Sequence, residues 1–262
     1  MIGSGSGGVG ALTSGKYGES NAVDVSDWGR YFAKILARNL KNTPISVIQV
    51  TNFHLIISIF CSWLIIQGNT IEGCFLLIIK GVIDAVDGEL ARLRERPSHV
   101  GRYWDTIADA IGLISVIYAF GIFLNWNLTL TFFIILAILF QYSLFNHFSI
   151  RMRTLGTGDS TSRIDERSTP IAHKWEKQRN VNLLHFIYLI FFSWQDSIVT
   201  RLTGRGSKTL AFELTVSSLL GYGVQSIFIF SLAVLDGLQY LPNLVFGING
   251  FLMILIILRS RL

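Results

Sequence analysis

Residues 80–112 read KGVIDAVDGELARLRERPSHVGRYWDTIADAIG and hold four aspartates between two apolar runs. Asp84 and Asp87 are three residues apart, and Asp105 and Asp109 are four apart. On a helix, both spacings put the pair on one face. Unpaired carboxylates in apolar surroundings are costly, and the usual remedies are protonation, a basic partner or a metal ion. The four aspartates together therefore predict a divalent-metal site.

Composition places the chain among polytopic membrane proteins. Of its 262 residues, 51% are hydrophobic and only 15% are charged, and the mean hydropathy is +0.50, which fits a membrane protein better than a soluble one. The net charge is +5, but the basic residues form short clusters beside the apolar runs. This favours cytoplasmic loops and anionic headgroups over nucleic acid.

The N-terminal part divides into a tail and a helix. Residues 1–25 are mostly Gly/Ser-rich and predict a flexible tail or the remnant of a removed fusion. Residues 26–41 alternate an apolar face with the cations Arg30, Lys34 and Arg38, which is typical of a helix lying in the headgroup plane. The alternative is an amphipathic helix packed on a soluble domain, but no such domain is evident. We expect residues 26–262 to form one membrane-embedded domain.

The rest of the chain predicts an all-α membrane helix bundle. About six transmembrane helices are expected, at 46–67, 71–91, 103–124, 128–150, 210–235 and 240–258. The second span contains Glu72 and Lys80, so it must be shielded by its neighbours, and Lys80 stands one turn before Asp84 and can pair with it. Residues 181–203 hold an apolar run of only about half a bilayer and are interpreted as a second interfacial helix.

Charge asymmetry predicts the orientation. With six spans, the N-terminal helix, the 92–102 loop, the 151–208 segment and the C-terminus lie on one side, and all are rich in Lys and Arg, whereas the short turns carry none. The first set is therefore expected in the cytoplasm. A seventh span would place Arg259 and Arg261 outside. The aspartates then meet near the cytoplasmic interface, in a cavity open to water and lipid.

Such a site suits two kinds of chemistry. Oxygen ligands select Mg²⁺ or a similar ion, which neutralises bridging phosphates in phosphoanhydride chemistry, and a carboxylate at the edge can accept a proton from a hydroxyl. Acidic pairs in spans also occur in proton or cation transporters, which is the main alternative class. The five histidines show no metal-ligand spacing and are expected to pack or face headgroups; they are His54, His99, His147, His173 and His185.

The central segment resembles the CDP-alcohol phosphotransferase superfamily. Its signature is Asp-x2-Asp-Gly-x2-Ala-Arg-x8-Gly-x3-Asp-x3-Asp, and the chain matches it in full at Asp84, Asp87, Gly88, Ala91, Arg92, Gly101, Asp105 and Asp109. The resemblance implies an integral membrane transferase of the EC 2.7.8 type, active in phospholipid biosynthesis. It would move a phosphatidyl or similar group from a CDP-linked donor to an alcohol and release CMP. It also implies a homodimer.

The resemblance also implies roles for single residues. Three aspartates, Asp84, Asp87 and Asp105, look like ligands of one or two Mg²⁺ or Mn²⁺ ions, and Asp109 looks like the remaining ligand or the general base. The small residues against which the cytidine nucleotide would lie are Gly88, Ala91 and Gly101. Arg92 either offers its guanidinium to a phosphate or pins the helix end through Glu89 or Glu95.

Donor and acceptor remain open at this stage. The compact six-span plan favours CDP-diacylglycerol as donor and a small polar alcohol as acceptor, and the competing hypothesis is a soluble CDP-alcohol donating to a lipid hydroxyl. A phosphorylated acceptor would need more cations, which Arg151, Arg153 and Arg201 supply if they face inward. Otherwise these arginines anchor the chain at the membrane.

Overall fold

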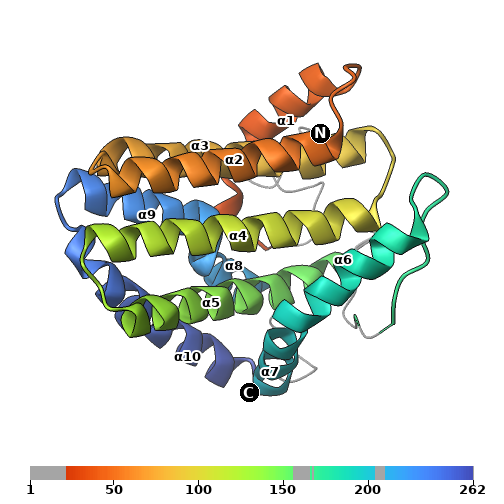
Figure 1. The fold of residues 1–262 in the computed structure, drawn as a ribbon. Helices are drawn as coiled ribbons and strands as arrows, with labels where there is room; N and C mark the ends of the chain where they lie inside the picture. The colour runs from red at the N-terminus through yellow and green to blue at the C-terminus, as the bar shows by residue number, and fades with distance from the viewer. Residues whose placement is uncertain (1–21, 156–165, 167, 204–209, 262) are drawn as a thin grey trace, which may run out of the picture.

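The structure is a computed structural model that describes residues 22–155, 166, 168–203 and 210–261. Within these ranges the chain forms helices and no strands (Figure 1). The α-helices are α1 (Arg30–Leu40), α2 (Val47–Ile66), α3 (Thr70–Leu93), α4 (His99–Phe123), α5 (Leu128–Leu155), α6 (Gln178–Phe191), α7 (Ser193–Thr203), α8 (Leu210–Ser217), α9 (Tyr222–Val234) and α10 (Gly250–Arg259). A π-helical segment, Asn243–Asn249, leads into α10.

Long helices lie side by side, and the turns that connect them gather at the two ends of the bundle. Helices α2 to α5 run alongside one another, with α9 packed on α3 and α8 on α5 (Figure 1). The turns that join α2 to α3 and α4 to α5, and the turn after α9, lie at one end of the bundle, whereas the α3–α4 loop and the start of α6 lie at the other. The bundle therefore has one end without basic residues in its turns and one basic end, as the charge pattern predicts.

Several helices are long and apolar enough to cross a membrane. Four segments qualify by length and composition: α2, α4, α5 and the Leu210–Val234 stretch that contains α8 and α9. The bent pair α6 and α7 makes a fifth if it is counted as one span. Helix α3 coincides with the predicted second span but is not among these because of its charged residues. The coarse prediction of a membrane helix bundle is confirmed, whereas the count of six is not.

Residues 181–203 differ from the prediction of one interfacial helix. They lie in two helices, α6 and α7, which meet at an angle of 55°. Asp196 in the first turn of α7 accepts hydrogen bonds from the Tyr188 hydroxyl at 2.8 Å and the Ser143 hydroxyl at 3.0 Å. These contacts join α7 to α6 and α5 and supply the polar partners that a carboxylate in apolar surroundings requires. The sequence pattern could not predict this bend.

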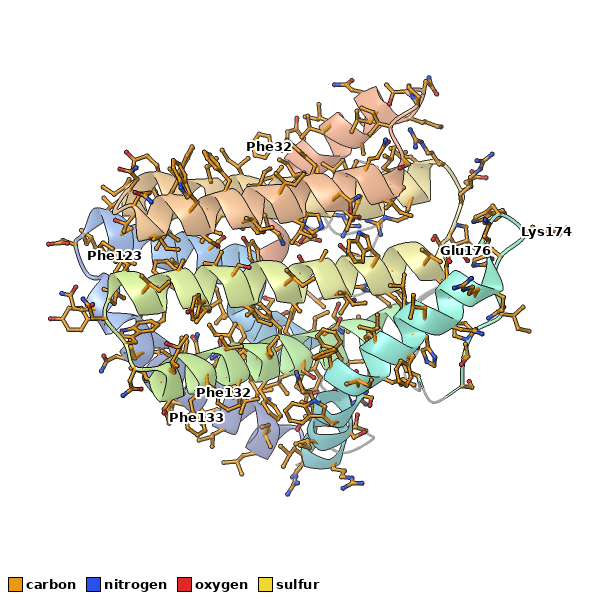
Figure 2. All side chains as sticks on the ribbon, viewed as in Figure 1. Phe32, Phe123, Phe132, Phe133, Lys174 and Glu176 are labelled. Atoms are coloured by element: carbon orange, nitrogen blue, oxygen red, sulfur yellow. The ribbon has the colours of Figure 1, made fainter. Side chains whose placement is uncertain are left out.

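The N-terminal helix is shorter than predicted. Helix α1 begins at Arg30, after a 3-10 turn at Val25–Asp27. Its buried alanines, Ala33 and Ala37, belong to one apolar cluster with Val50 of α2 and with Val86 and Leu90 of α3. Its large apolar side chains are exposed; they are Tyr31, Phe32, Ile35 and Leu36, and Phe32 points away from the bundle (Figure 2). The placement of α1 at the membrane interface stays a prediction.

The predicted tail lies mostly outside the described residues, which begin at residue 22. Ala22 is buried against the α5–α8–α10 core. The backbone N–H of Val23 donates to the Thr215 hydroxyl at 3.0 Å, and that of Val25 donates to the Ser218 hydroxyl at 3.0 Å. Packing therefore begins four residues before the predicted domain boundary at residue 26.

The outer surface of the bundle is apolar. Phe132 and Phe133 on α5 are 59% and 52% exposed and point away from the bundle (Figure 2). Large apolar side chains are also exposed on α2, α4, α9 and α10. Such a surface is unfavourable in water and suits contact with lipid chains.

Candidate active site

Helix α3 carries a polar stripe toward the bundle interior. Lys80, Asp84 and Asp87 follow one another at spacings of four and three residues, so they share a helix face. The same face continues into the apolar core through Cys74 and Leu77, which are buried. The predicted clustering of Asp84 and Asp87 on one face is therefore seen in the structure.

Helix α4 presents its two aspartates to the same space. Asp105 and Asp109 lie in its first turns, and Gly112 follows on the same face. A Cβ atom at Gly112 would lie only 2.8 Å from Oγ of Ser58 on α2. Glycine therefore allows α2 and α4 to approach closely, one turn away from Asp109.

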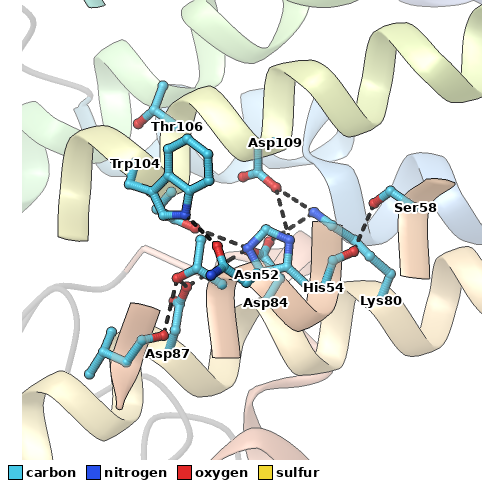
Figure 3. Close-up of polar contacts among 12 residues, drawn as sticks. Asn52, His54, Ser58, Lys80, Asp84, Asp87, Trp104, Thr106 and Asp109 are labelled. Atoms are coloured by element: carbon cyan, nitrogen blue, oxygen red, sulfur yellow. Dashed lines mark hydrogen bonds and ion pairs between the residues drawn. The ribbon is translucent and has the colours of Figure 1, made fainter. Parts of the chain in front are cut away.

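His54 lies in the middle of the aspartates (Figure 3). It stands one turn before Ser58 on α2 and is completely buried. Its Nε2 atom is 3.4 Å from Asp105 Oδ1, 3.5 Å from Asp84 Oδ1 and 3.9 Å from Asp87 Oδ2. Its Nδ1 atom is 4.0 Å from Asp109 Oδ1. Complete burial excludes headgroup contact for His54, and the carboxylates around it show that it packs inside the polar cluster and not against apolar side chains alone.

The sequence contained a signal for this histidine. Polar residues recur at spacings of three and four along the otherwise apolar α2, and all are buried; they are Thr51, His54, Ser58 and Ser62. This stripe faces the polar stripes of α3 and α4. The Thr51 hydroxyl donates to Asp87 Oδ2 at 2.7 Å. The polar periodicity of the first span therefore points to His54, whereas the spacing of the histidines does not.

Lys80 supplies a buried positive charge beside the cluster. Its side chain is only 4% exposed, and its Nζ atom lies 3.5 Å from Asp84 Oδ2, as the sequence predicts. It also donates a hydrogen bond to Asp109 Oδ1, and it lies 4.5 Å from the centre of the Tyr222 ring. Lys80 therefore contacts one aspartate of each pair, Asp84 on α3 and Asp109 on α4.

The donor set fits a divalent ion. One ligand atom from each of His54, Asp84, Asp87 and Asp105 lies within 4.8 Å of all the others. Both ring nitrogens of His54 and Oδ1 of Asp105 are buried and have no hydrogen-bond partner among the described residues. Buried polar atoms normally have a partner. The arrangement therefore has the ligand types, the spacing and the unsatisfied atoms that an ion would require.

A first cavity of about 280 Å³ adjoins the cluster on the side of α1. Asp84, Asp87, Gly88 and Arg92 line it, together with the 26–30 segment. A Cβ at Gly88 would meet only the Arg92 guanidinium, with Nη2 at 3.4 Å. The predicted residues Gly88 and Arg92 thus share one cavity with Asp84, Asp87 and Asp105.

Arginines at this cavity are held by Glu89. Its Oε1 accepts from Nε of Arg30 at 2.6 Å and from Nη2 of Arg92 at 2.9 Å. Burial disfavours the charge of Arg30, but the carboxylates of Asp27 and Glu89 outweigh this and raise the pKa of Arg30 above its ordinary value. Arg92 therefore both pairs with Glu89 and borders the cavity, so the two roles considered for it are compatible.

A second cavity of about 370 Å³ extends from Asp105 and Asp109 into the bundle. Polar side chains from α4, α5 and α7 line part of it, among them Thr106, Asn146 and Asp196. Much of the remaining wall is aliphatic and is formed by Leu77, Leu113, Val116, Ile117, Ile138, Leu139, Ile229, Leu241 and Val245. Aromatic side chains also line it; they are Tyr142, Phe145, Tyr188, Phe192 and Tyr222. Asp105, Phe145, Arg153 and Tyr222 line both cavities, so the two spaces meet beside the cluster.

Some predicted residues lie apart from the cavities. Ala91 and Gly101 are not among the lining residues of either one. Gly101 instead shapes the start of α4, because its N–H donates to the Ser98 hydroxyl at 2.8 Å and a Cβ would lie 3.1 Å from that oxygen. Of the three candidate arginines, Arg153 lines both cavities, whereas Arg151 and Arg201 line neither.

Comparison with known proteins gives one finding for this region. The family model for CDP-alcohol phosphatidyltransferase matches residues 43–201, more than half of the chain. The matched range runs from the residues before α2 into α7 and includes His54, Lys80 and the four aspartates. No curated protein matches the chain.

Proposed function

The chain belongs to the CDP-alcohol phosphatidyltransferase family, and from this premise we propose that it transfers a phosphatidyl group from CDP-diacylglycerol to a small polar alcohol. CMP would be released, in phospholipid biosynthesis. The observation that carries the proposal is the cluster of Asp84, Asp87 and Asp105 at the junction of the two cavities.

We propose that the first cavity takes the CMP part of the donor. Support comes from Gly88, where the absence of a side chain leaves the wall open beside the aspartates. Arg92 and Arg153 border the same space and can offer guanidinium groups to phosphate oxygens. Divalent ions held by Asp84, Asp87 and Asp105, Mg²⁺ or Mn²⁺, would neutralise the diphosphate of the donor.

Asp109 is our candidate for the general base. It is 40% exposed and lines the second cavity. Its contacts with Lys80 and His54 both use Oδ1, so the carboxylate is held in one orientation beside the space where an acceptor would lie. The acceptor oxygen would attack the lipid-bound phosphorus and give its proton to Asp109, while the bond from that phosphorus to the CMP oxygen breaks.

The second cavity supports a lipid and a polar alcohol together. Its aliphatic walls suit acyl chains, and Thr106, Asn146 and Asp196 offer partners for hydroxyl groups. We propose Arg153 as a phosphate contact. Arg151 and Arg201 have no comparable support. The opposite arrangement, in which a soluble CDP-alcohol donates to a lipid hydroxyl, would use the same aliphatic walls for the acceptor.

We further propose that the site faces the cytoplasm and that the protein is a homodimer. The first proposal rests on the basic residues of the α3–α4 loop and of the α5–α6 segment, which follow the positive-inside pattern. The dimer rests on the family resemblance. Crosslinking in native membranes, followed by electrophoresis, tests it.

The decisive experiment supplies the purified protein, in lipid nanodiscs with Mg²⁺ or Mn²⁺, with one donor at a time. Radiolabelled CDP-diacylglycerol is offered with a panel of small alcohols, and labelled CDP-choline is offered with diacylglycerol. We expect CMP release only with CDP-diacylglycerol. Release only with CDP-choline would support the reverse arrangement. Release with neither, together with dissipation of an ion gradient in proteoliposomes, would support a transporter.

A further inference from the structure

His54 is in an unusual position for a buried histidine. Its side chain is completely shielded from solvent, yet neither ring nitrogen has a hydrogen-bond partner among the described residues. A buried polar atom without a partner costs free energy. The ring is also aimed at carboxylates from two helices, so its orientation serves a partner that belongs between these groups.

The geometry around Nε2 resembles a ligand shell. In an octahedral shell with bonds of about 2.1 Å, neighbouring ligand atoms are about 3.0 Å apart and opposite ones about 4.2 Å apart. The distances from Nε2 to Asp105, Asp84 and Asp87 are 3.4, 3.5 and 3.9 Å, between these two values. They are too long for strong hydrogen bonds, so an ion between the atoms explains them better than direct pairing.

Lys80 already supplies a positive charge to two of the aspartates. It contacts Oδ2 of Asp84 and Oδ1 of Asp109, whereas the Nε2 atom of His54 faces the other oxygen of Asp84, Oδ1. One oxygen of Asp84 is therefore directed to the lysine and the other to the space beside the imidazole. On the far side of the ring, Nδ1 faces Asp109 at 4.0 Å, where metal-bound histidines usually have a carboxylate.

We propose that His54 is a nitrogen ligand of the metal site, alongside Asp84, Asp87 and Asp105. This inference rests on the proposed function and adds to it a preference among metals. Carboxylate and water ligands suit Mg²⁺, whereas an imidazole raises affinity for divalent transition metals, in the order Mn²⁺, Fe²⁺, Co²⁺. The site therefore selects Mn²⁺ or a later ion over Mg²⁺ more strongly than carboxylates alone would.

Electron paramagnetic resonance of bound Mn²⁺ tests the proposal without an activity assay. The protein in nanodiscs is loaded with Mn²⁺, and electron spin echo modulation is recorded for coupling to ¹⁴N. We expect imidazole coupling in the wild type and none in His54→Gln. We also expect His54→Gln to weaken Mn²⁺ binding by about tenfold or more, the loss caused even by an outer partner of a ligand, with a smaller loss for Mg²⁺.

A matched control is His147→Gln, which changes a helical histidine that hydrogen-bonds to Thr203 instead. It should keep the nitrogen coupling. If His54→Gln does not fold, single glutamine variants of the other four histidines assign the coupling by elimination, and each must retain it. Absence of coupling in the wild type, or its persistence in His54→Gln, overturns the proposal.

The same experiment separates this inference from the proposed function. One outcome is that the wild type binds Mn²⁺ without nitrogen coupling and that Asp87→Asn abolishes this binding. That result would support the carboxylate site and would exclude only His54 as a ligand. Failure to bind Mn²⁺ or Mg²⁺ at all overturns both. Persistence of binding in Asp84→Asn, Asp87→Asn and Asp105→Asn also overturns both, because the ion then lies elsewhere.

Discussion

Side chains of the same type have different surroundings at this site. Asp87 is nearly buried and accepts a hydrogen bond from Thr51, whereas Asp109 is 40% exposed and is held by Lys80. Burial and fixed partners suit a ligand, whose position must be constant. Exposure to a cavity suits a group that exchanges a proton with a substrate. Asp84 and Asp105, at 24% and 35% exposed, lie between these two. Asp109 differs from the other three aspartates because it lies outside the cluster of possible ligand atoms and lines the second cavity but not the first.

Replacement of Asp109 tests this separation. Asp109→Asn keeps the shape of the side chain and an oxygen for Lys80, but removes the basic carboxylate. We expect Mn²⁺ and CMP binding to stay near the wild-type values while turnover falls by about 10²–10⁴-fold, the usual contribution of a general base. Calorimetry and CMP release measure the two quantities. The control is Asp236→Asn in the turn after α9; wild-type turnover in Asp109→Asn would contradict the assignment.

Replacement of Gly88 tests the nucleotide cavity. A leucine there extends past the Arg92 guanidinium, which a Cβ already meets at 3.4 Å, and fills space beside Asp84 and Asp87. We expect Gly88→Leu to weaken CMP binding by at least about tenfold, or about 1.4 kcal/mol, and Gly88→Ala to weaken it less. Thermal unfolding without ligand should change little in Gly88→Ala. Unchanged CMP affinity in Gly88→Leu would show that the nucleotide binds elsewhere.

At the scale of helices, the approach of α2 to α4 brings the cluster together. Gly112 and Ser58 meet with no room for a Cβ. Helices α2 and α4 run in the same direction (Figure 1), so one turn earlier on each helix His54 faces Asp109. One turn earlier again on α2, Thr51 reaches Asp87 of α3. The tight contact at Gly112 therefore fixes how α2 and α4 approach each other, whereas α3 has a close contact of its own with α2 at Gly73.

Gly112→Ala tests this contact. The added Cβ would lie 2.8 Å from Oγ and 2.9 Å from Cβ of Ser58, so one helix must shift. We expect a loss of about 1–3 kcal/mol in stability, as for other overpacked contacts, together with weaker Mn²⁺ binding. Ser58→Gly in the same chain removes both clashing atoms and should restore metal binding. The control is Gly247→Ala, where nothing lies within 4 Å of the new Cβ. If Gly112→Ala had the same unfolding temperature as the wild type, this role of Gly112 would be contradicted.

At the scale of the whole molecule, the proposed metal site would link α2, α3 and α4 at the border of both cavities. Carboxylates from different helices repel one another where water is scarce, and an ion between them turns this repulsion into a crosslink. Stability of the bundle should therefore depend on divalent ions. Helices far from the site, such as α8 and α10, would gain stability only because the whole bundle unfolds cooperatively.

Metal removal tests this dependence. The unfolding temperature in nanodiscs is measured in chelator and then with increasing Mn²⁺ at constant ionic strength. We expect it to rise with Mn²⁺, with a gain of about 2.7 kcal/mol when the free ion is about one hundred times its Kd. Asp105→Asn should reduce this gain. Equal unfolding temperatures with and without Mn²⁺ would show that the cluster holds no ion.

Local patterns in the sequence determined much of this protein's secondary structure and part of its site. Hydrophobic runs and helical spacing predicted the membrane helix bundle, the helices that carry the aspartates and the shared face of each pair, because these depend only on neighbours within a few turns. The pairing of Lys80 with Asp84 was predicted for the same reason. Gly88 and Arg92 share a cavity with Asp84 and Asp87, whereas their contact with a nucleotide stays a prediction.

Only the tertiary structure decided the rest. The place of His54, the contact of Lys80 with Asp109, the inward position of Arg153 and the bend between α6 and α7 all depend on helices that are distant in the sequence. Their register follows from how closely two surfaces can pack, as Gly112 and Ser58 do. Periodicity shows which face of a helix is polar, but steric fit decides which polar face it meets.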